Sequence, residues 1–488
     1  VSTSSDAYGD WVFGVAPIRD AAGEVAAVLE IGRDFYVFNA AMDEIVKAVL
    51  LEALSLLMVL VLLVFEFIYL VNLLAGLESA GKGRGRRLGD RQSPAFLARP
   101  IGCLFFTALS FPTAFVPLRM LELARPEDWL SPGALAAAAV SAQMLAFGLA
   151  VLASGRLIAD RGAAWVIHAG FLFSGLGLIL SWLAGDADLF LLANLVLGAG
   201  SGAGFLGIRS LLLREPDREL GDIGYSDFYS GMTAGGYAGL GIGSVVAGHA
   251  GYQPTFFVAL LVMLAAWAVS ARLLPWIPPP GIAGAPAARP APRRGYSGFF
   301  RDRGVLVFLL FHIVPVYVLA GYVTYYFTVF AESRGMGIGD IGRLLLLHGL
   351  LVIYWGPTAA RLLLPKLGGR ALVMSAQAIY CLALVFFAFL DDLPGAMAAL
   401  VAFGLVEGVS VAGANSLFLS LAGVKRLGEE RAVAVAEMIG KFGETIGPLA
   451  FALALGLGGR SGLIGLAAIF LAAAALLGSG LPARVVPD

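Results

Sequence analysis

Three charged residues near the C-terminal end of the sequence recur at a helical spacing. Glu437, Lys441 and Glu444 stand at positions i, i+4 and i+7 of an otherwise apolar segment, so they share one face of a helix. Counted from Arg431 along a membrane-spanning helix, Glu444 lies about 20 Å deep. A carboxylate beside an ammonium at that depth can exchange a proton or a cation. The alternative is a structural ion pair, with Glu437 solvated at the cytoplasmic end of the helix.

Other isolated polar residues also fall inside apolar segments. Arg209 and Glu407 are expected near the middle of their helices, with Asn415 at the position that corresponds to Arg209 if the chain is duplicated. Arg209 can clamp a carboxylate or phosphate group of a small molecule, or pair with a polar group of the first or fifth core helix. His312 and His348 can relay protons near neutral pH; structural hydrogen bonding is the alternative for both.

The composition places these residues in a membrane protein. The 488 residues are 59% hydrophobic and only 14% charged, with a mean hydropathy of +0.86, whereas an ordinary soluble domain is about half apolar. A net charge of -1 argues against a nucleic-acid partner. Cys103 and Cys381 lie in separate apolar segments, which argues against a disulfide framework. We find no phosphate-binding loop, metal-ligand cluster or nucleophile motif, so neither a cofactor nor an enzymatic activity is expected.

Thirteen apolar segments approach the roughly 20 residues that a spanning helix needs. The first, 46–75, contains Glu66, which we interpret only as a contact to the rest of the protein or a self-association site. The basic sequence KGRGRR separates it from the others. Twelve segments follow in two sets of six, at 100–119, 132–154, 164–184, 189–212, 225–249, 254–275, 305–331, 341–363, 371–390, 395–421, 432–457 and 462–482.

We therefore predict an all-α membrane protein with a twelve-helix core and one extra helix. Most of the 33 Lys and Arg residues fall in loops that would then be cytoplasmic, as the positive-inside rule requires. We expect a multi-pass protein of a bacterial inner membrane. Its predicted parts are an extra transmembrane helix at 44–75, a basic cytoplasmic linker at 76–98, a six-helix bundle at 99–274, a cytoplasmic inter-bundle linker at 275–304 and a second six-helix bundle at 305–484.

The N-terminal segment, residues 1–43, has a different character. The sequence DWVFGVAPIRDAAGEVAAVLEIGRD predicts two alternating strands joined by a turn at Asp20 to Gly23. It resembles the closing hairpin of extracytoplasmic PAS-like or Cache sensor domains. Two strands are not stable alone, so we expect the rest of a small ligand-sensing domain upstream of Val1. A short extracytoplasmic tail is the alternative.

Weak internal similarity indicates that the two sets of six helices arose by duplication. Three pairs of short motifs share nearly the same offset: GRLIADRG with ARLLLPKLG, GIRSLLL with GANSLFL, and the Gly-rich stretches around Gly236 and Gly443. Transporter halves often retain such similarity. A parallel duplication of six helices explains the nearly constant offset better than chance similarity of apolar segments, which is the alternative.

The segment SGRLIADRGAAW resembles the cytoplasmic signature between helices 2 and 3 of the major facilitator superfamily, G-x-x-x-D-R-x-G-R-R. Four residues rather than three separate Gly155 from Asp160, and alanines replace the trailing arginines. The resemblance, over about 98–484, implies that the acidic residue braces a helix end and holds the bundles closed on the cytoplasmic side. An ordinary loop with a solvated ion pair is the alternative. The matching residues are Gly155, Asp160, Arg161 and Gly162.

Two Gly-rich segments strengthen the resemblance. GGYAGLGIGSVVAG at 235–248 is similar to the family's helix 5 motif but lacks its proline, and GETIGP at 443–448 carries one. Small residues at this spacing permit close approach of helices. Tight packing therefore explains these glycines without any substrate.

The resemblance implies a secondary transporter that works by alternating access around a midplane site. The expected partners are the lipid bilayer and a small polar or charged solute, with proton coupling as one option. The alternative is a transmembrane receptor that uses a facilitator-like bundle as a ligand-sensing module, which an appended cytoplasmic output domain would favour.

Overall fold

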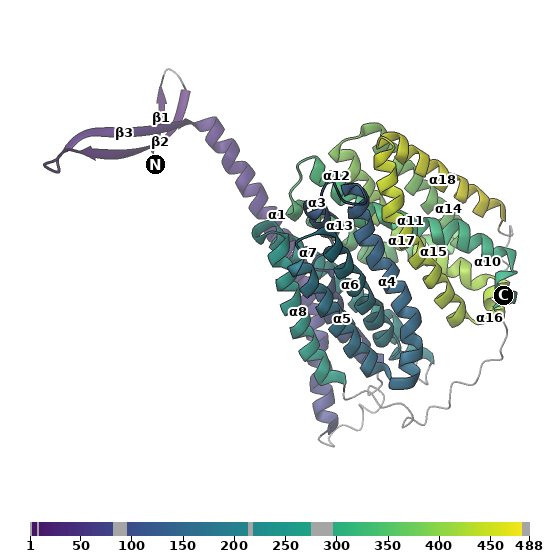
Figure 1. Cartoon of the computed structure of the whole chain (residues 1–488). Coiled ribbons are helices and arrows are strands. Elements are labelled where there is room, and N and C mark those ends of the chain that lie inside the picture. The colour runs from purple at the N-terminus through teal and green to yellow at the C-terminus, as the bar shows by residue number, and fades with distance from the viewer. Residues whose placement is uncertain (1, 7–8, 82–94, 213–217, 275–295, 481–488) are drawn as a thin grey trace. The chain divides into compact units, whose positions relative to one another are not determined.

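The computed structural model describes residues 2–6, 9–81, 95–212, 218–274 and 296–480 (Figure 1). The chain divides into two compact units, Val1–Leu60 and Val61–Asp488. The predicted basic sequence KGRGRR and most of the predicted inter-bundle linker at 275–304 lie outside the described residues.

The N-terminal unit contains an antiparallel sheet of strands β1 (Ser2–Asp6), β2 (Gly9–Arg19) and β3 (Val25–Asp34), in that order. The predicted hairpin is confirmed as β2 and β3. Its turn forms because Asp20 Oδ1 accepts hydrogen bonds from the amides of Ala22 and Glu24 at 2.8 and 3.0 Å, while Gly23 adopts a φ of 88° that favours glycine. Strand β1 escaped prediction because STSSD has no alternation of apolar and polar residues.

Helix α1 (Phe35–Gly81) follows β3 directly and is longer than the predicted 44–75. It starts early because Asp34 Oδ1 accepts hydrogen bonds from the amides of Tyr36 and Val37, at 2.8 and 3.2 Å. A carboxylate in that position satisfies amides that lack a partner in the first helical turn. The helix therefore runs without a break from the end of the sheet into the membrane-spanning segment.

The first half of the core contains α2 (Ala95–Ser110), α3 (Val116–Leu123), α4 (Pro132–Arg161), α5 (Ala163–Leu183), α6 (Ala187–Arg209), α7 (Arg218–Ala250) and α8 (Tyr252–Leu273). The single helix predicted at 100–119 is wrong, because a turn at 111–115 separates α2 from α3. Pro112 lies within this turn and Pro117 in the first turn of α3, and a proline removes a backbone donor from the helical ladder.

The second half begins with α9 (Ser297–Phe300) and contains short π-helical turns in two of its spanning helices. The first of these spans consists of α10 (Arg303–Phe308), η4 (Leu309–Ile313), α11 (Val314–Gly321), η5 (Tyr322–Tyr326) and α12 (Phe327–Ser333). Then follow α13 (Ile338–Leu350), η6 (Leu351–Trp355), α14 (Gly356–Leu390), α15 (Leu393–Ser420), α16 (Ala422–Leu427), α17 (Glu429–Gly456) and α18 (Arg460–Gly480).

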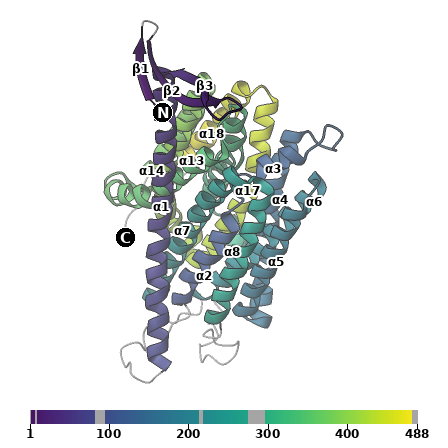
Figure 2. The same ribbon diagram turned by 90° about the vertical axis from the view of Figure 1, so that its left-hand side faces the viewer.

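The helices reproduce the predicted plan of one helix followed by six and six. Ten helical stretches among the described residues are long and apolar enough to cross a membrane, and one of them, Ile338–Leu390, holds two spans that meet at Gly368. The broken pair α2–α3 and the less apolar α7 supply the remaining predicted spans. Figures 1 and 2 show the helices of the first half, blue to teal, gathered apart from those of the second, green to yellow.

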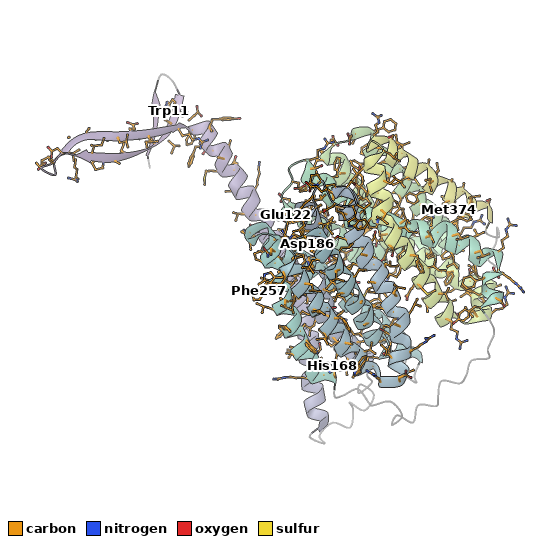
Figure 3. All side chains as sticks on the ribbon, viewed as in Figure 1. Trp11, Glu122, His168, Asp186, Phe257 and Met374 are labelled. Atoms are coloured by element: carbon orange, nitrogen blue, oxygen red, sulfur yellow. The ribbon has the colours of Figure 1, made fainter. Side chains whose placement is uncertain are left out.

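Local geometry repeats between the two halves and supports the predicted duplication. Gly162 joins α4 to α5 with φ 88° and ψ 163°, and Gly368 joins the two parts of α14 with φ 75° and ψ 160°. Asp186, labelled in Figure 3, caps α6 through a 2.8 Å hydrogen bond from the amide of Leu189. Asp392 caps α15 in the same way, from the amide of Gly395 at 2.8 Å. Both pairs are separated by the same number of residues.

Glycines bring α7 into backbone contact with α2. A Cβ atom on any of three α7 glycines would lie only 2.0 to 2.3 Å from a carbonyl oxygen of α2 or of the turn that follows it. The pairs are Gly235 with Cys103, Gly239 with Thr107 and Gly243 with Phe111. In the second half, Gly443 and Gly447 of α17 approach the carbonyl oxygens of Val314 and Val318 in the same manner. Close packing thus explains the Gly-rich segments, as the sequence predicted.

Replacing one of these glycines should loosen the first half. In Gly239→Ala the new Cβ would lie 2.0 Å from the Thr107 carbonyl oxygen, so we expect a lower Tm in detergent, equivalent to about 1–3 kcal/mol of overpacking. Gly236→Ala is the matched control, because its Cβ would meet Ser110 Oγ at an ordinary 3.6 Å. Equal melting temperatures for the two variants would contradict the packing argument.

Candidate functional site

An ion pair joins the two halves of the core. Arg209 Nη1 donates a hydrogen bond to Glu437 Oε2 on α17, and the Tyr229 hydroxyl of α7 donates to Glu437 Oε1 at 3.2 Å. All three groups are partly buried. A single carboxylate of the second half therefore connects α6 and α7 of the first half.

The expectation of a lone Arg209 at mid-helix is wrong. Arg209 is the last residue of α6, and Ser210 is the C-cap. The Arg209 guanidinium therefore stands at the end of the helix that the sequence assigns to the cytoplasmic side. A cation there is favoured by the helix dipole. Glu437 lies near the start of α17, which places both charges at the same end of the bundle.

The other two charges on α17 pair with each other. Lys441 Nζ lies 2.6 Å from Glu444 Oε2 and 4.7 Å from the centre of the Phe147 ring on α4. A small apolar crevice lies beside this pair between α4 and α17, lined in part by Gly148 and Phe442. The predicted charged face of α17 is thus divided: Glu437 reaches across to the first half, and Lys441 with Glu444 forms a pair along the helix.

A second polar cluster joins α13 to α15. His348 on α13 is only 2% exposed; its Nε2 lies 3.3 Å from Glu407 Oε2, and its Nδ1 lies 3.2 Å from the Leu400 carbonyl oxygen. Glu407 is therefore not the lone charge that the sequence indicated. A proton on Nδ1 would donate to the carbonyl, and a proton between Nε2 and the carboxyl group would make that contact a hydrogen bond.

This histidine cluster also lies at a contact between the halves. The contact is made by Tyr237 of α7. A Cβ on Gly349, the neighbour of His348, would lie 2.2 Å from the Tyr237 ring. The glycine therefore provides the space that the tyrosine ring of the other half occupies.

Two predicted residues lie apart from these clusters. His312 is buried in η4, its ring centroid 5.0 Å from that of Phe308. Its Nδ1 has no hydrogen-bond partner among the described residues. Asn415 is exposed on α15, and no hydrogen bond within the described part of the chain joins it to the charged groups above. The structure does not bring His312 or Asn415 together with Arg209, Glu437, Lys441 or Glu444.

The predicted gate motif is helical rather than a loop. Residues 155–161 belong to the last turns of α4, and Gly162 alone connects α4 to α5, because its positive φ lets the chain reverse in one residue. Asp160 is exposed and forms no ion pair with any described residue. The Arg161 guanidinium lies 4.6 Å above the Trp165 ring, and Gly155 faces open space.

At the end of the core away from the Arg209–Glu437 pair, the two halves contact each other through small residues. The Tyr325 hydroxyl donates a hydrogen bond of 2.9 Å to the carbonyl of Gly133 at the start of α4. A Cβ on Gly342 of α13 would lie 2.1 Å from Ser244 Cβ on α7. The halves are thus in close contact at the end where α4 begins, and the Arg209–Glu437 pair bridges them at the other end.

The sequence profile of the Major Facilitator Superfamily matches residues 100–448. The chain belongs to the major facilitator superfamily. It is accordingly a multi-pass integral membrane protein, and its twelve-helix core is the fold of that superfamily. A comparison with curated protein sequences found no match.

Solved structures of facilitator proteins resemble this chain in fold at low sequence identity. A bacterial homologue of the human lysosomal transporter Spinster, inward-facing and unoccupied, has 14% identity and a TM-score of 0.62, covering 80% of this chain and 97% of its own. A D-xylose–proton symporter has 15% identity and a TM-score of 0.63, with coverages of 80% and 98%. A nucleoside transporter has 15% identity and a TM-score of 0.61, with coverages of 79% and 98%.

Two tyrosines at the contacts between the halves were not predicted from the sequence. Tyr229 and Tyr237 both contact charged groups of the second half or their neighbours. They stand eight residues apart on α7, so they lie near one face of that helix. The sequence feature that could have identified them is their spacing within the Gly-rich segment of α7.

The inter-half ion pair should show strong coupling between its partners. We expect Arg209→Gln and Glu437→Gln each to lower the Tm in detergent, and the double variant to lower it by less than the sum, because either change alone leaves one charge without its partner. The expected coupling is about 1.5–3 kcal/mol. Strict additivity in melting experiments would mean that the pair is not formed in the folded protein.

Proposed function

We propose that this chain is a secondary active transporter of a small polar or charged solute in a bacterial inner membrane. It would work by alternating access between its two six-helix halves, as a transporter rather than an enzyme. The observation that carries the proposal is the Arg209–Glu437 pair, which links the halves at one end of the core while small residues close the other. Breaking this link is the local change that opening of that end requires.

An anionic group on the solute is the natural competitor for this link. A guanidinium binds carboxylate and phosphate groups through paired hydrogen bonds, so an anionic solute can replace Glu437 as the partner of Arg209. Glu437 would then be a partly buried carboxylate without a cation, which is costly inside a membrane protein. Uptake of a proton by Glu437 removes that cost, so solute binding and proton uptake favour the same opening step.

The family match supports transport over the alternative of a receptor that only senses its ligand. Proton coupling draws support from the resemblance in fold to a proton symporter. It also draws support from the His348–Glu407 contact, in which an imidazole and a carboxyl group lie 3.3 Å apart. The cytoplasmic gate role of Asp160, Arg161, Gly155 and Gly162 remains a prediction from the family resemblance.

The first test is transport in liposomes with an imposed pH gradient and a lumenal pH dye. Small organic anions, with neutral and cationic compounds of similar size for comparison, should produce solute-dependent proton movement only with the anions. Arg209→Gln should reduce it at least tenfold, because it removes the proposed clamp. Arg343→Gln is the control, since Arg343 pairs with Asp340 on its own helix. Saturable binding without flux of any compound would favour the receptor alternative.

Three carboxylate variants separate the possible proton sites in the same assay. Glu437→Gln should leave anion flux but remove its coupling to protons, because the amide cannot take up a proton when Arg209 is released. Glu407→Gln and Glu444→Gln test the His348 and Lys441 pairs in the same way. The proposed mechanism is wrong if Glu437→Gln keeps the wild-type number of protons moved per solute.

A further inference from the structure

Helix α1 carries a carboxylate that contacts the core. Glu66 Oε1 lies 2.7 Å from Arg99 Nη2, and Glu66 Oε2 lies 3.0 Å from Arg99 Nε, so α2 donates a pair of hydrogen bonds to it. Arg99 Nη1 also donates to Asp227 Oδ1 of α7 at 3.2 Å. One guanidinium thus binds carboxylates from two other helices.

The burial pattern around Glu66 fixes the rotation of α1. Glu66 is 8% exposed, while the next residues, Phe67 and Ile68, are 65% and 50% exposed. A charged side chain on a lone helix in a bilayer would be costly, and its apolar neighbours need no protein partner there. In α1 the carboxylate is buried and the apolar residues beside it are exposed. The side of the helix that carries Glu66 therefore faces the core.

The surface of α2 and α7 that faces α1 leaves space for the Arg99 side chain. A Cβ on Gly231, one turn after Asp227 on α7, would lie 2.8 Å from Arg99 Cγ, so this glycine leaves room for the stem of the arginine. The glycine contacts further along hold α7 against α2. Arg99 and Asp227 therefore stand on two helices that are locked to each other, and Asp227 holds the guanidinium in place.

We propose that the α2–α7 surface formed by Arg99, Asp227 and Gly231 is a docking site for a membrane-spanning helix bearing a carboxylate, and that α1 is its occupant. Helix α1 then behaves as a seventh helix of the first half and moves with that half. Because β3 leads directly into α1, a ligand-induced change in the N-terminal unit would act on the transporter through this contact. The docking does not depend on the identity of the solute.

The test uses the full chain with a protease site inserted between residues 82 and 94 and an affinity tag at the C-terminus. After the protein has folded in membranes, it is cleaved and solubilised, and the fraction of the N-terminal fragment that copurifies with the core is measured. We expect most of it to remain bound in the wild type and in the Phe67→Ala control, and Glu66→Ala to lower retention at least fivefold.

A charge exchange separates docking from folding. Glu66→Arg alone should abolish retention, because it places two guanidinium groups together, and Glu66→Arg with Arg99→Glu should restore it, since the new arginine can bind both acidic residues. Each core should elute as a single species in size-exclusion chromatography. Wild-type retention in Glu66→Ala, or loss of the fragment from the wild type itself, would overturn the proposal.

Discussion

Contact between helix backbones at glycines is the constraint on which both halves of this protein depend. Lipid tails are as apolar as leucine, so helices in a bilayer gain little from burying apolar side chains and associate through close packing. The approach of Gly239 to the Thr107 carbonyl, and of Gly447 to that of Val318, fixes a corresponding pair of helices in each half. Arg99, Asp227 and Glu437 stand on helices that are held in this way.

The charged groups lie at boundaries between these packed parts and differ in how firmly they are held. Arg99 makes three hydrogen bonds to carboxylates on two helices, as a permanent attachment requires. Arg209 is paired with a carboxylate of the opposite half. Both arrangements avoid the cost of an unpaired charge in the membrane.

Hydropathy and repeated motifs predicted the thirteen helices, their division and the N-terminal hairpin, because these depend on local composition. Partners on different helices could not be predicted: Arg209 and Glu437 are 228 residues apart and Glu66 lies on a separate helix from Arg99. Periodicity shows which face a residue occupies but not which helix packs there. The break at 111–115 and the helical course through Arg161 depend on single prolines and glycines, whose effect a hydropathy average does not register.

At Gly162 and Gly368 a single residue, rather than a loop, connects two consecutive membrane-spanning helices. A longer loop would let two helices tilt independently. Here a single glycine connects the two helices of each pair, so the tilt of one constrains the tilt of the other. A displacement of α4 at its contact with α17 would therefore pass directly to α5. Gly368 joins two helices of the second half in the same way. The paired helices in each half would therefore move together.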